Sequence, residues 1–436
     1  MARVAVIGAG AMGLAAAYHA LKAGHEVEVF EADTIPGGMA AHFDFDGLSI
    51  ERFYHFVCKA DRPTFELMEE LGIGDAMKWR PTSMGYFVDG EHHRWGDPIA
   101  LLKFPRLGLI SKFRYGLQMF LATRRTRWSD LENVSAKDWF ISGGGRKAYD
   151  ILWRRLFELK FFEFADNVSA AWIWTRIKRV GTSRRSLMQE ELGYIDRGSE
   201  TLIRALVDAI EGAGGLIHLG KPVSEIASAD NVVQGVVADG ELREFDAVIS
   251  TTPTPVISKL VPSLPTESKA AYDAIRNIGV VCVILKLARP VTPHFWLNIN
   301  DERIDIPGIV EFSNLREIPE TVVYVPYYMP QTHPKFGRDD EAFLQETLGY
   351  IKLLNPEITD ADLLASQVGR LRYAQPVCEP GFLAKLPRVQ TPIRGLQIAD
   401  TCYYYPEDRG ISESVRYGKL MAAAVTDMDI WKREGR

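Results

Sequence analysis

A glycine-rich turn near the amino terminus constrains the fold more than any other feature of this sequence. Arg3–Ile7 has the β-branched, apolar pattern of a buried strand, and it leads directly into Gly8-Ala-Gly-Ala-Met-Gly13. An Ala-rich helix follows, and a second strand, Val27–Phe30, ends at Glu31. The first glycine permits a tight turn, the second lets a pyrophosphate approach the backbone, and the third lets helix and strand pack closely. This order of elements predicts a Rossmann-like α/β fold that binds a dinucleotide.

The residues in and beside this turn are the first candidate cofactor ligands. At the start of the helix, the free N–H groups of the segment that contains Ala11 and Met12 suit phosphate. Glu31, which Ala32 follows, can accept hydrogen bonds from an adenosine ribose. An acidic residue at this point disfavours a ribose 2′-phosphate, and therefore NADP.

Further segments extend the pattern over nearly the whole chain. A Gly-Gly pair follows the acidic residue, a middle unit of helix and strand closes with a strand and a proline turn, and a last buried strand with an acid at its tip precedes a final helix. The segments are Gly37-Gly38-Met39, Gly193–Gly198, Pro222-Val223, Asp246–Pro253, Gly395–Asp400 and Arg409–Ser414. Taken together, these segments resemble the flavoprotein superfamily of amine oxidases, protoporphyrinogen oxidases and phytoene desaturases. The resemblance implies an FAD-binding domain of the Rossmann type, assembled from discontinuous segments.

The resemblance also implies roles for individual residues. Val223 contacts the adenine, and Asp400 binds the ribityl chain. The helix that begins at Gly410 and Ile411 points its amino terminus at the flavin pyrimidine edge, where its dipole favours the negative charge of a reduced flavin. The expected cofactor-binding residues are Gly8, Gly10, Ala11, Met12, Gly13, Glu31, Ala32, Gly37, Gly38, Met39, Tyr54, His55, Val223, Thr252, Asp400, Gly410 and Ile411.

Two positions depart from the family pattern. Met39 stands where an arginine is common, and Ala399 stands where a glycine usually precedes the acid. Cys402 lies close to this segment, but no cysteine occupies the position at which some amine oxidases attach flavin covalently, so we expect a non-covalent cofactor. The four cysteines are far apart and form no CxxC pair, which predicts neither a disulfide framework nor a metal site.

Two candidate catalytic residues follow from the family comparison. His55 lies in the bulky stretch Glu51–Phe56 and resembles the histidine that UDP-galactopyranose mutases place against the flavin, where it could hydrogen-bond or move a proton. A packed structural histidine is the alternative. Lys286 ends the strand Val280–Lys286 and resembles the amine oxidase lysine that holds a water at flavin N5. A shift of register by one residue would turn this side chain to the opposite face.

The segment Tyr403–Arg409 supplies two more candidates. Because it follows Asp400, we expect Tyr405 and Arg409, with Asp408, to lie near the flavin or near a polar end of the substrate. Ordinary packing of tyrosines in a half-buried loop is the alternative interpretation.

The middle of the chain has a different composition. Residues 101–190 contain 18 Lys+Arg against 8 Asp+Glu, and five of the nine tryptophans, whereas the whole chain has a net charge of −6. Three interpretations are open: attachment to an anionic membrane surface, capture of an anionic substrate, or a helical subdomain with a basic solvated face. A nucleic-acid partner is not expected, since the chain is acidic and no recognition motif is present.

The sequence therefore predicts three parts. These are an FAD-binding domain (1–80, 193–255 and 390–436), a mixed-sheet substrate domain (256–389 with part of 81–100) and a basic, aromatic helical subdomain (101–192). We expect a cytoplasmic FAD-dependent oxidoreductase that acts on a small amine or lipid-like substrate by hydride transfer at flavin N5, with membrane association through the basic subdomain as an open interpretation. A non-redox sugar mutase of the UDP-galactopyranose mutase type is the alternative.

Overall fold

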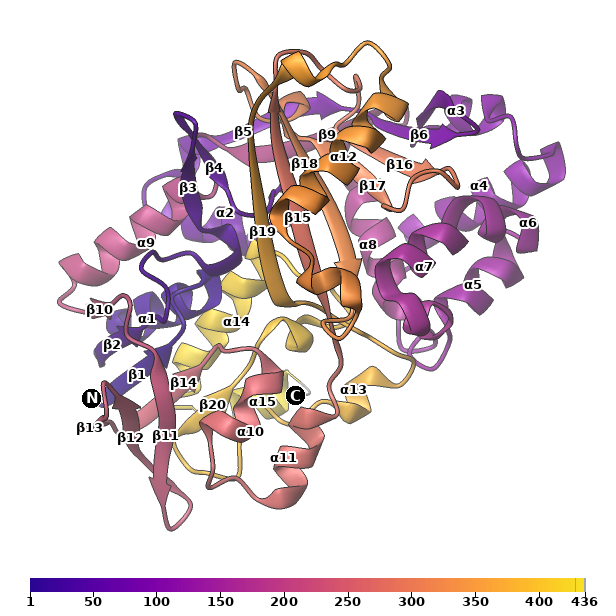
Figure 1. Ribbon diagram of the computed structural model, residues 1–436. Coiled ribbons are helices and arrows are strands. Elements are labelled where there is room, and N and C mark those ends of the chain that lie inside the picture. Colours follow the sequence, from indigo (N-terminus) through magenta and orange to yellow (C-terminus); the bar gives the residue numbers. More distant parts are fainter. Residues whose placement is uncertain (428, 435–436) are drawn as a thin grey trace.

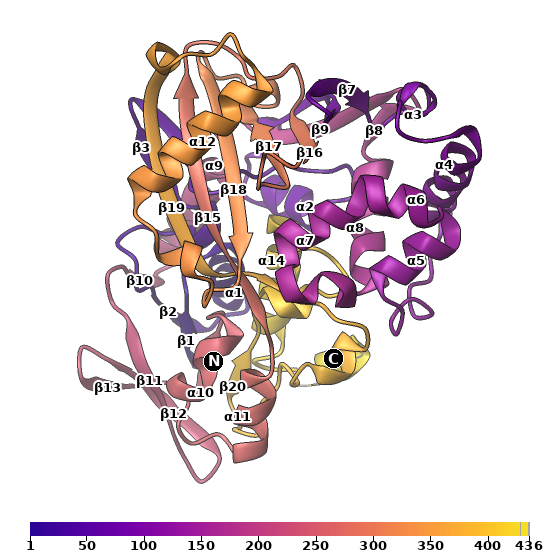
Figure 2. The same ribbon diagram turned by 45° about the vertical axis from the view of Figure 1, so that its right-hand side comes forward.

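The computed structural model describes residues 1–427 and 429–434. A parallel sheet with flanking helices, a large mixed sheet and a cluster of helices make up most of the molecule (Figure 1). The helical cluster and the parallel sheet lie at opposite ends, with the mixed sheet between and beside them (Figure 2).

The parallel sheet gathers strands that are far apart in the sequence. Its order is β10–β2–β1–β14–β20, and every neighbouring pair is parallel. The strands are β1 (Arg3–Ile7), β2 (Glu26–Phe30), β10 (Leu216–His218), β14 (Ala247–Ser250) and β20 (Leu396–Ile398). The predicted Rossmann-like α/β fold is confirmed.

Each face of this sheet is covered by a different layer. Val4 and Val6 face one core, which helices α1 (Ala11–Lys22), α9 (Glu200–Gly212) and α14 (Ile411–Ala423) complete. Ala5 and Ile7 face the other core, because strand side chains alternate between faces. That second layer consists of β11 (Val223–Ala229), β12 (Val232–Ala238), β13 (Glu241–Glu244), α10 (Ile257–Leu260) and α11 (Thr266–Asp273).

The mixed sheet has the order β19–β15–β18–β17–β16–β6–β7 and is antiparallel except between β16 and β6. Its long strands are β15 (Asn277–Leu287), β18 (Thr321–Met329) and β19 (Leu363–Pro376), and its shorter ones are β6 (Met84–Val88), β7 (Glu91–Trp95), β16 (Trp296–Asn300) and β17 (Gly308–Glu311). Helix α12 (Asp340–Leu354) covers one face. The other face packs against the hairpin of β3 (His42–Phe45) and β4 (Leu48–Glu51) and the aromatic residues that follow it.

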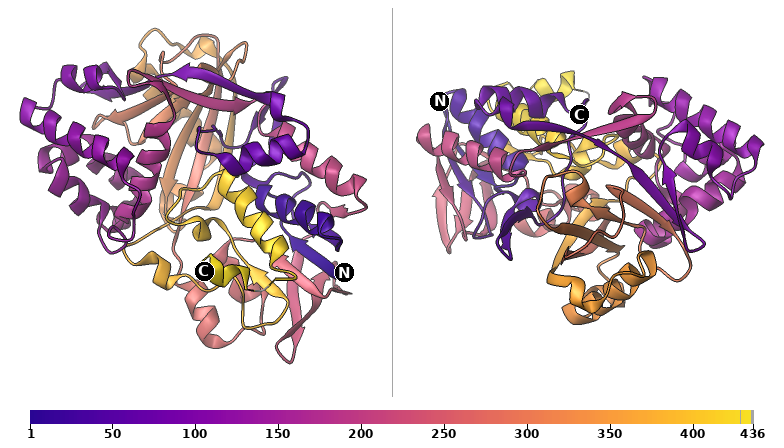
Figure 3. Two further views of the ribbon diagram at one scale, coloured as in Figure 1. Left: turned by 180° about the vertical axis from the view of Figure 1, so that it is seen from behind. Right: turned by 90° about the horizontal axis from the view of Figure 1, so that it is seen from above.

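A long antiparallel ribbon leads into and out of the helical cluster. It consists of β5 (Met77–Thr82) and β9 (Gln189–Ile195), with β8 (Arg184–Ser186) added (Figure 3). The cluster comprises α3 (Pro98–Lys103), α4 (Leu109–Arg124), α5 (Ala136–Gly143), α6 (Arg146–Tyr149), a π-helical turn (Asp150–Arg154), α7 (Arg155–Phe161) and α8 (Ala170–Thr182). Helices α2 (Arg62–Glu70), α13 (Phe382–Lys385) and α15 (Ile430–Arg433) complete the elements that matter here.

Candidate functional site

The candidate cofactor residues gather where the parallel strands end. The residues directly after β1, β2, β14 and β20 are Gly8, Glu31, Thr251 and Ala399, with Asp400 next. Open parallel sheets bind their ligands at this edge. A surface hollow at the amino ends of the same strands is lined by Arg3, Asp246 and Gly395 instead. We therefore place the functional site at the carboxyl edge.

The three glycines of the first turn differ in what surrounds them. A Cβ added to Gly13 would lie 1.8 Å from the carbonyl oxygen of Gly8, so this position packs helix against strand. Gly8 itself has φ +102, which other residues rarely adopt. At Gly10 the nearest atom to an added Cβ is Gly38 Cα at 4.0 Å. The space beside Gly10 is therefore open, as close approach of a pyrophosphate requires.

The second glycine pair packs directly onto the first turn. Gly37 N–H donates to the carbonyl oxygen of Ala9 at 2.8 Å, and Gly10 and Gly37 form an isolated parallel bridge. Glu31 holds the same turn, because its Oε2 accepts from Ala9 N–H at 2.7 Å. Its Oε1 accepts from Asp33 N–H at 2.9 Å. A carboxylate oxygen has further acceptor capacity, so these bonds are compatible with additional bonds to ribose hydroxyls.

Helix α14 brings its amino terminus to the same edge. Gly410 is its N-cap, and nothing lies within 4 Å of a Cβ added there. Ser412 Oγ in the first turn is buried and has no hydrogen-bond partner within residues 1–427 and 429–434. Gly418 lets α14 cross α1 closely, since an added Cβ would lie 2.5 Å from Met12 O. The open N-cap and the unpartnered hydroxyl fit a polar ligand edge such as the flavin pyrimidine ring.

The structure gives Asp400 three hydrogen bonds, from two residues, at the tip of β20. Its Oδ2 accepts from Thr254 N–H at 2.6 Å and from Thr254 Oγ1 at 2.5 Å, and its Oδ1 accepts from Cys402 N–H at 2.8 Å. The carboxylate thus holds the turn after β14 against the turn after β20. Thr252 lies in the same turn and shares a hydrogen bond of 2.8 Å with Ser250. The predicted contact of Asp400 with a ribityl chain stays a prediction.

The remaining predicted cofactor residues lie as follows. Val223 begins β11, which follows β10 after the short connection 219–222, and Met39 lies in the 3-10 turn Gly38–Ala40. Ala11 and Met12 are buried in the first turn of α1, whereas Ala32 is exposed after Glu31.

Tyr54 and His55 come from the loop after β4 and lie close enough to Arg409, which precedes α14, for its charge to act on both. Burial lowers the pKa of His55 to about 4; the nearby Glu51 opposes this shift, and His42 and Arg409 reinforce it. His55 Nδ1 is buried and unpartnered among the residues that the structure describes. Arg409 also acts on the pKa of Tyr54, which burial raises well above its usual value. His55 and Arg409, which the sequence predicts as separate candidates, therefore lie in the same part of the structure.

His55 should make the stability of the protein depend on pH. Its pKa is about 4 when folded and about 6.5 when unfolded, so between these values the unfolded chain binds a proton that the folded protein does not. The free energy of unfolding should therefore fall as pH decreases from about 6.5 to 4, by about 1–3 kcal/mol from this group. Urea unfolding at several pH values should show a shallower fall for His55→Gln than for the wild type.

Sequence reasoning missed a buried lysine that lies beside Arg409. Lys160, on α7, is 5% exposed, and its Nζ lies 4.9 Å from the ring centre of Tyr328 and 5.2 Å from that of Trp172. Burial, followed by the charge of Arg176, lowers its pKa well below the usual value. Its only sequence signal is a cation directly before the aromatic pair Phe161 and Phe162.

Two arginines and one carboxylate complete this group, which we call the cation cluster: Lys160, Arg176, Arg409 and Asp408. Arg176 Nη1 lies 3.0 Å from Asp408 Oδ2. Arg409 donates to Ala374 O and, at 3.3 Å, to the Tyr328 hydroxyl. Burial raises the Asp408 pKa, but the charges of Arg176, Lys160 and Arg409 outweigh it, so the pKa lies below its usual value. Within the described part of the chain, Asp408 is the only carboxylate that forms an ion pair with any of the three cations.

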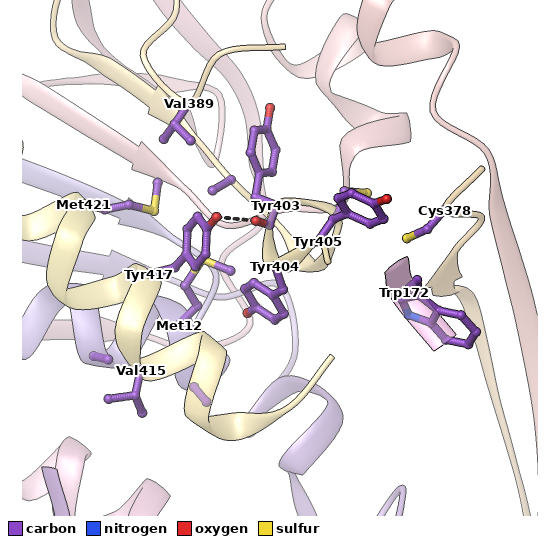
Figure 4. Packing of buried hydrophobic residues seen from close by; sticks show 14 of the residues in the cluster. Met12, Trp172, Cys378, Val389, Tyr403, Tyr404, Tyr405, Val415, Tyr417 and Met421 are labelled. Atoms are coloured by element: carbon purple, nitrogen blue, oxygen red, sulfur yellow. Dashed lines mark hydrogen bonds between the residues drawn. The ribbon is translucent and has the colours of Figure 1, made fainter. Parts of the chain in front are cut away.

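The structure places Tyr405 toward the helical cluster. It is fully buried, and its hydroxyl donates to Glu132 at 2.5 Å and shares a bond of 2.8 Å with Ser169. Figure 4 shows the ring directed toward Trp172 and Cys378, while Tyr417 donates to the Tyr403 carbonyl. These contacts fit the packing interpretation of this loop, and they give the predicted catalytic hydroxyl two partners on other segments.

Lys286 forms an ion pair and a hydrogen bond with the β3–β4 hairpin. The sequence pattern did not predict this contact. Its Nζ lies 3.0 Å from Asp46 Oδ2 in the β3–β4 turn and 3.4 Å from Glu320 Oε1. The same nitrogen donates to the Asp46 carbonyl oxygen at 3.0 Å. The predicted water-holding role at flavin N5 stays a prediction, and the structure gives this lysine the role of joining β15 to the hairpin.

A comparison with known protein families shows which family the chain belongs to. A model of the family described as flavin containing amine oxidoreductase matches residues 13–400. The chain belongs to this family. The expected FAD cofactor and oxidoreductase class are thereby confirmed, and the open glycine turn and the α14 amino terminus are the features of the structure that fit the cofactor.

Curated relatives align with almost the whole chain, and solved structures share its fold over almost the same length. The 15-cis-phytoene desaturase of Glycine max is 23% identical over 469 aligned positions, covering 97% of this chain and 79% of the desaturase. A putative protoporphyrinogen oxidase from Exiguobacterium has a TM-score of 0.76 at 17% identity, covering 97% and 98% of the two chains. A reduced UDP-galactopyranose mutase has a TM-score of 0.77 at 16% identity, covering 100% and 98%. Putrescine oxidase bound to putrescine has a TM-score of 0.70 at 19% identity, covering 98% and 99%. At these identities, the solved structures support the fold alone.

Proposed function

We propose that this FAD-dependent oxidoreductase removes a hydride from a carbon of a neutral or anionic, lipid-like substrate rather than from a protonated amine. The observation that carries the proposal is the cation cluster beside the α14 amino terminus. Arg176 pairs with Asp408, and the charges of Arg409 and Lys160 also act on this carboxylate.

The electrostatics of the cation cluster argue against an ammonium ligand. Arginine stays protonated in proteins, so two guanidinium groups face one carboxylate even when Lys160 is neutral. Like charges in a poorly solvated site repel one another strongly. An anionic group on the substrate would instead gain charge-assisted hydrogen bonds from the two guanidinium groups. It would also favour protonation of Lys160.

The surrounding side chains suit an apolar substrate body. Tyr54 packs edge-on against Trp296 and Phe295, with ring centres 5.8 and 6.4 Å apart. Arg176 lies over the Trp296 ring at 5.8 Å, so the aromatic group adjoins the cation cluster. Several of the relatives are desaturases of phytoene or zeta-carotene, which supports a lipid-like substrate for this chain too.

Bound FAD supplies the electron sink for such an oxidation. The protein has to orient the donor carbon, exclude water and accept a proton. The aromatic residues around Tyr54 can orient and desolvate the donor. His55, with its pKa of about 4, is a neutral imidazole near pH 7 and can therefore accept a proton.

A sugar mutase that uses reduced flavin is the second candidate function. The same cation cluster suits a phosphate-bearing substrate, and the fold likeness to UDP-galactopyranose mutase covers 100% of this chain. The two candidates differ in whether the substrate loses hydrogen.

Anaerobic mixing of the oxidised holoenzyme with candidate donors tests the proposal. We expect neutral or anionic isoprenoid-like donors to bleach the visible flavin band and to yield a product lighter by the mass of H2. Turnover that needs dithionite-reduced enzyme and leaves the product mass unchanged would assign the mutase function instead. Bleaching by protonated diamines alone would overturn the electrostatic argument.

A further inference from the structure

The outer helices of the cluster expose large apolar side chains to solvent. Ile110, Phe113 and Leu117 on α4 are 79%, 71% and 45% exposed. The other exposed apolar residues of α3 and α4 are Ile99, Leu102, Leu109, Phe120 and Leu121. We call these eight residues the apolar stripe. Large exposed apolar patches are rare on soluble monomeric proteins, and where they occur they usually mark an interaction site.

The inner face of α4 is fully used in packing, so the stripe is the outward face. Tyr115, Gln118 and Ala122 are buried against the rest of the cluster. Gln118 Nε2 donates to the carbonyl oxygen of Trp139 at 2.7 Å, which fixes the rotation of the helix. Ile110, Phe113 and Leu117 recur at helical spacing on the opposite side. Helices α3 and α4 form the outer edge of the cluster, remote from the parallel sheet (Figure 2).

The charged residues of the segment that carries the apolar stripe are all basic, and two of them, Arg106 and Arg125, pair with Asp89 and Asp130 outside it. Residues 98–129 contain seven Lys and Arg residues and no Asp or Glu. Lys103, Arg124 and Arg127 are exposed, and none of them forms an ion pair with any residue in 1–427 or 429–434. Arg124 lies over the ring of Phe120 at 5.1 Å, so a cation borders the stripe directly.

This charge pattern distinguishes between two possible partners of the apolar stripe, a second copy of the chain and a lipid bilayer. A second copy of the chain, packed about a twofold axis, would bring the same cations against one another. An anionic bilayer surface offers negative headgroups to the cations and acyl chains to the leucine and phenylalanine side chains. In the residues that the structure describes, no helix has the length and apolar character needed to span a bilayer.

We propose that the apolar stripe on α3 and α4 is a membrane-docking surface that inserts into the headgroup region of an anionic lipid bilayer. The flanking cations, among them Lys103, Arg124 and Arg127, bind the lipid phosphates. The inference does not depend on the identity of the redox substrate. It gives the enzyme direct access to substrates that are dissolved in the bilayer.

Vesicle flotation of the holoenzyme tests this surface. The wild type should float with phosphatidylglycerol/phosphatidylcholine vesicles, less with phosphatidylcholine alone, and less again at high salt. The triple variant Ile110→Gln, Phe113→Gln, Leu117→Gln preserves charge and should weaken the affinity for vesicles about tenfold or more, because the apolar contact area is lost. The double variant Arg124→Gln, Arg127→Gln should lose the preference for anionic vesicles.

A matched control separates the surface from general effects of the substitutions. Leu216→Gln, Leu242→Gln, Leu364→Gln replaces three exposed leucines on β10, β13 and β19 and should float like the wild type. Flavin content and circular dichroism should be the same for all variants. Absence of wild-type flotation at low salt, or equal flotation of the triple variant, would overturn the proposal. A wild-type dimer that the triple variant dissolves, without vesicle binding, would assign the stripe to a second copy of the chain.

Discussion

Replacing Gly10 by alanine is expected to give a folded protein that has lost most of its affinity for FAD. The new Cβ would meet only Gly38 Cα, at 4.0 Å, which is an ordinary van der Waals contact. Gly10 has φ −72, a value that alanine adopts without strain. The methyl group would, however, project toward the place that the pyrophosphate needs. Overpacking by a methyl group costs about 1–3 kcal/mol, so the dissociation constant for FAD should rise about 10- to 100-fold.

Gly13→Ala provides the matched comparison for this result. Its Cβ would lie 1.8 Å from the backbone oxygen of Gly8, so the packing of α1 against β1 must shift. We expect this variant to lose thermal stability as well as flavin, whereas Gly10→Ala apoprotein should unfold at the temperature of wild-type apoprotein. Flavin titration and thermal unfolding measure the two effects separately. Normal flavin affinity in Gly10→Ala would contradict the assignment of this turn to the pyrophosphate.

Replacing Lys160 by methionine is expected to raise the free energy of unfolding and to lower the affinity of the site for an anionic ligand. Lys160 is buried among aromatic rings, and burial followed by the charge of Arg176 lowers its pKa. Replacing buried charges by an apolar side chain of similar size is often neutral or stabilising, here by about 1–4 kcal/mol. Asp408 would keep Arg176 as its partner. An anionic ligand, in contrast, would lose one of its cations.

The lowered pKa of Lys160 also fixes the direction in which the stability of the wild type changes with pH. The folded-state pKa of Lys160 lies below the unfolded value of about 10.4, so between the two pKa values the unfolded chain binds the extra proton. The wild type should therefore gain stability as pH rises through this interval, and Lys160→Met should lack that gain. Urea unfolding at neutral and alkaline pH measures the difference. Lys147→Met, on the exposed side of α6, should change neither stability nor ligand affinity.

The parts of the site that depend on local pattern were predictable from the sequence. Strand β1, the glycine turn and the start of α14 follow from hydrophobic periodicity, glycine spacing and helix-start signals, which are properties of short segments. The structure places Gly8, Glu31 and Gly410 at one edge of a parallel sheet, as those signals require.

The parts that depend on tertiary contacts were not predictable in the same way. Lys160 is buried because α7 packs against Tyr328 from the mixed sheet, and no local pattern encodes that meeting. Tyr405 hydrogen-bonds Ser169 and Glu132 in the helical cluster, whereas its position after Asp400 in the sequence predicted a place near the flavin or a polar end of the substrate. Lys286 was placed on the correct strand, but its ion pair with Asp46 depends on how the β3–β4 hairpin packs.

We propose that the cation cluster makes the site bind a neutral or anionic substrate rather than a cationic one. The most direct measurement is a spectral titration of the oxidised holoenzyme with two long-chain ligands of equal length, an alkyl phosphate and an alkylammonium. The cation cluster predicts that the phosphate perturbs the flavin spectrum at about tenfold lower concentration than the ammonium, and that Lys160→Met narrows the difference. Tighter binding of the ammonium, with no effect of Lys160→Met, would contradict the claim.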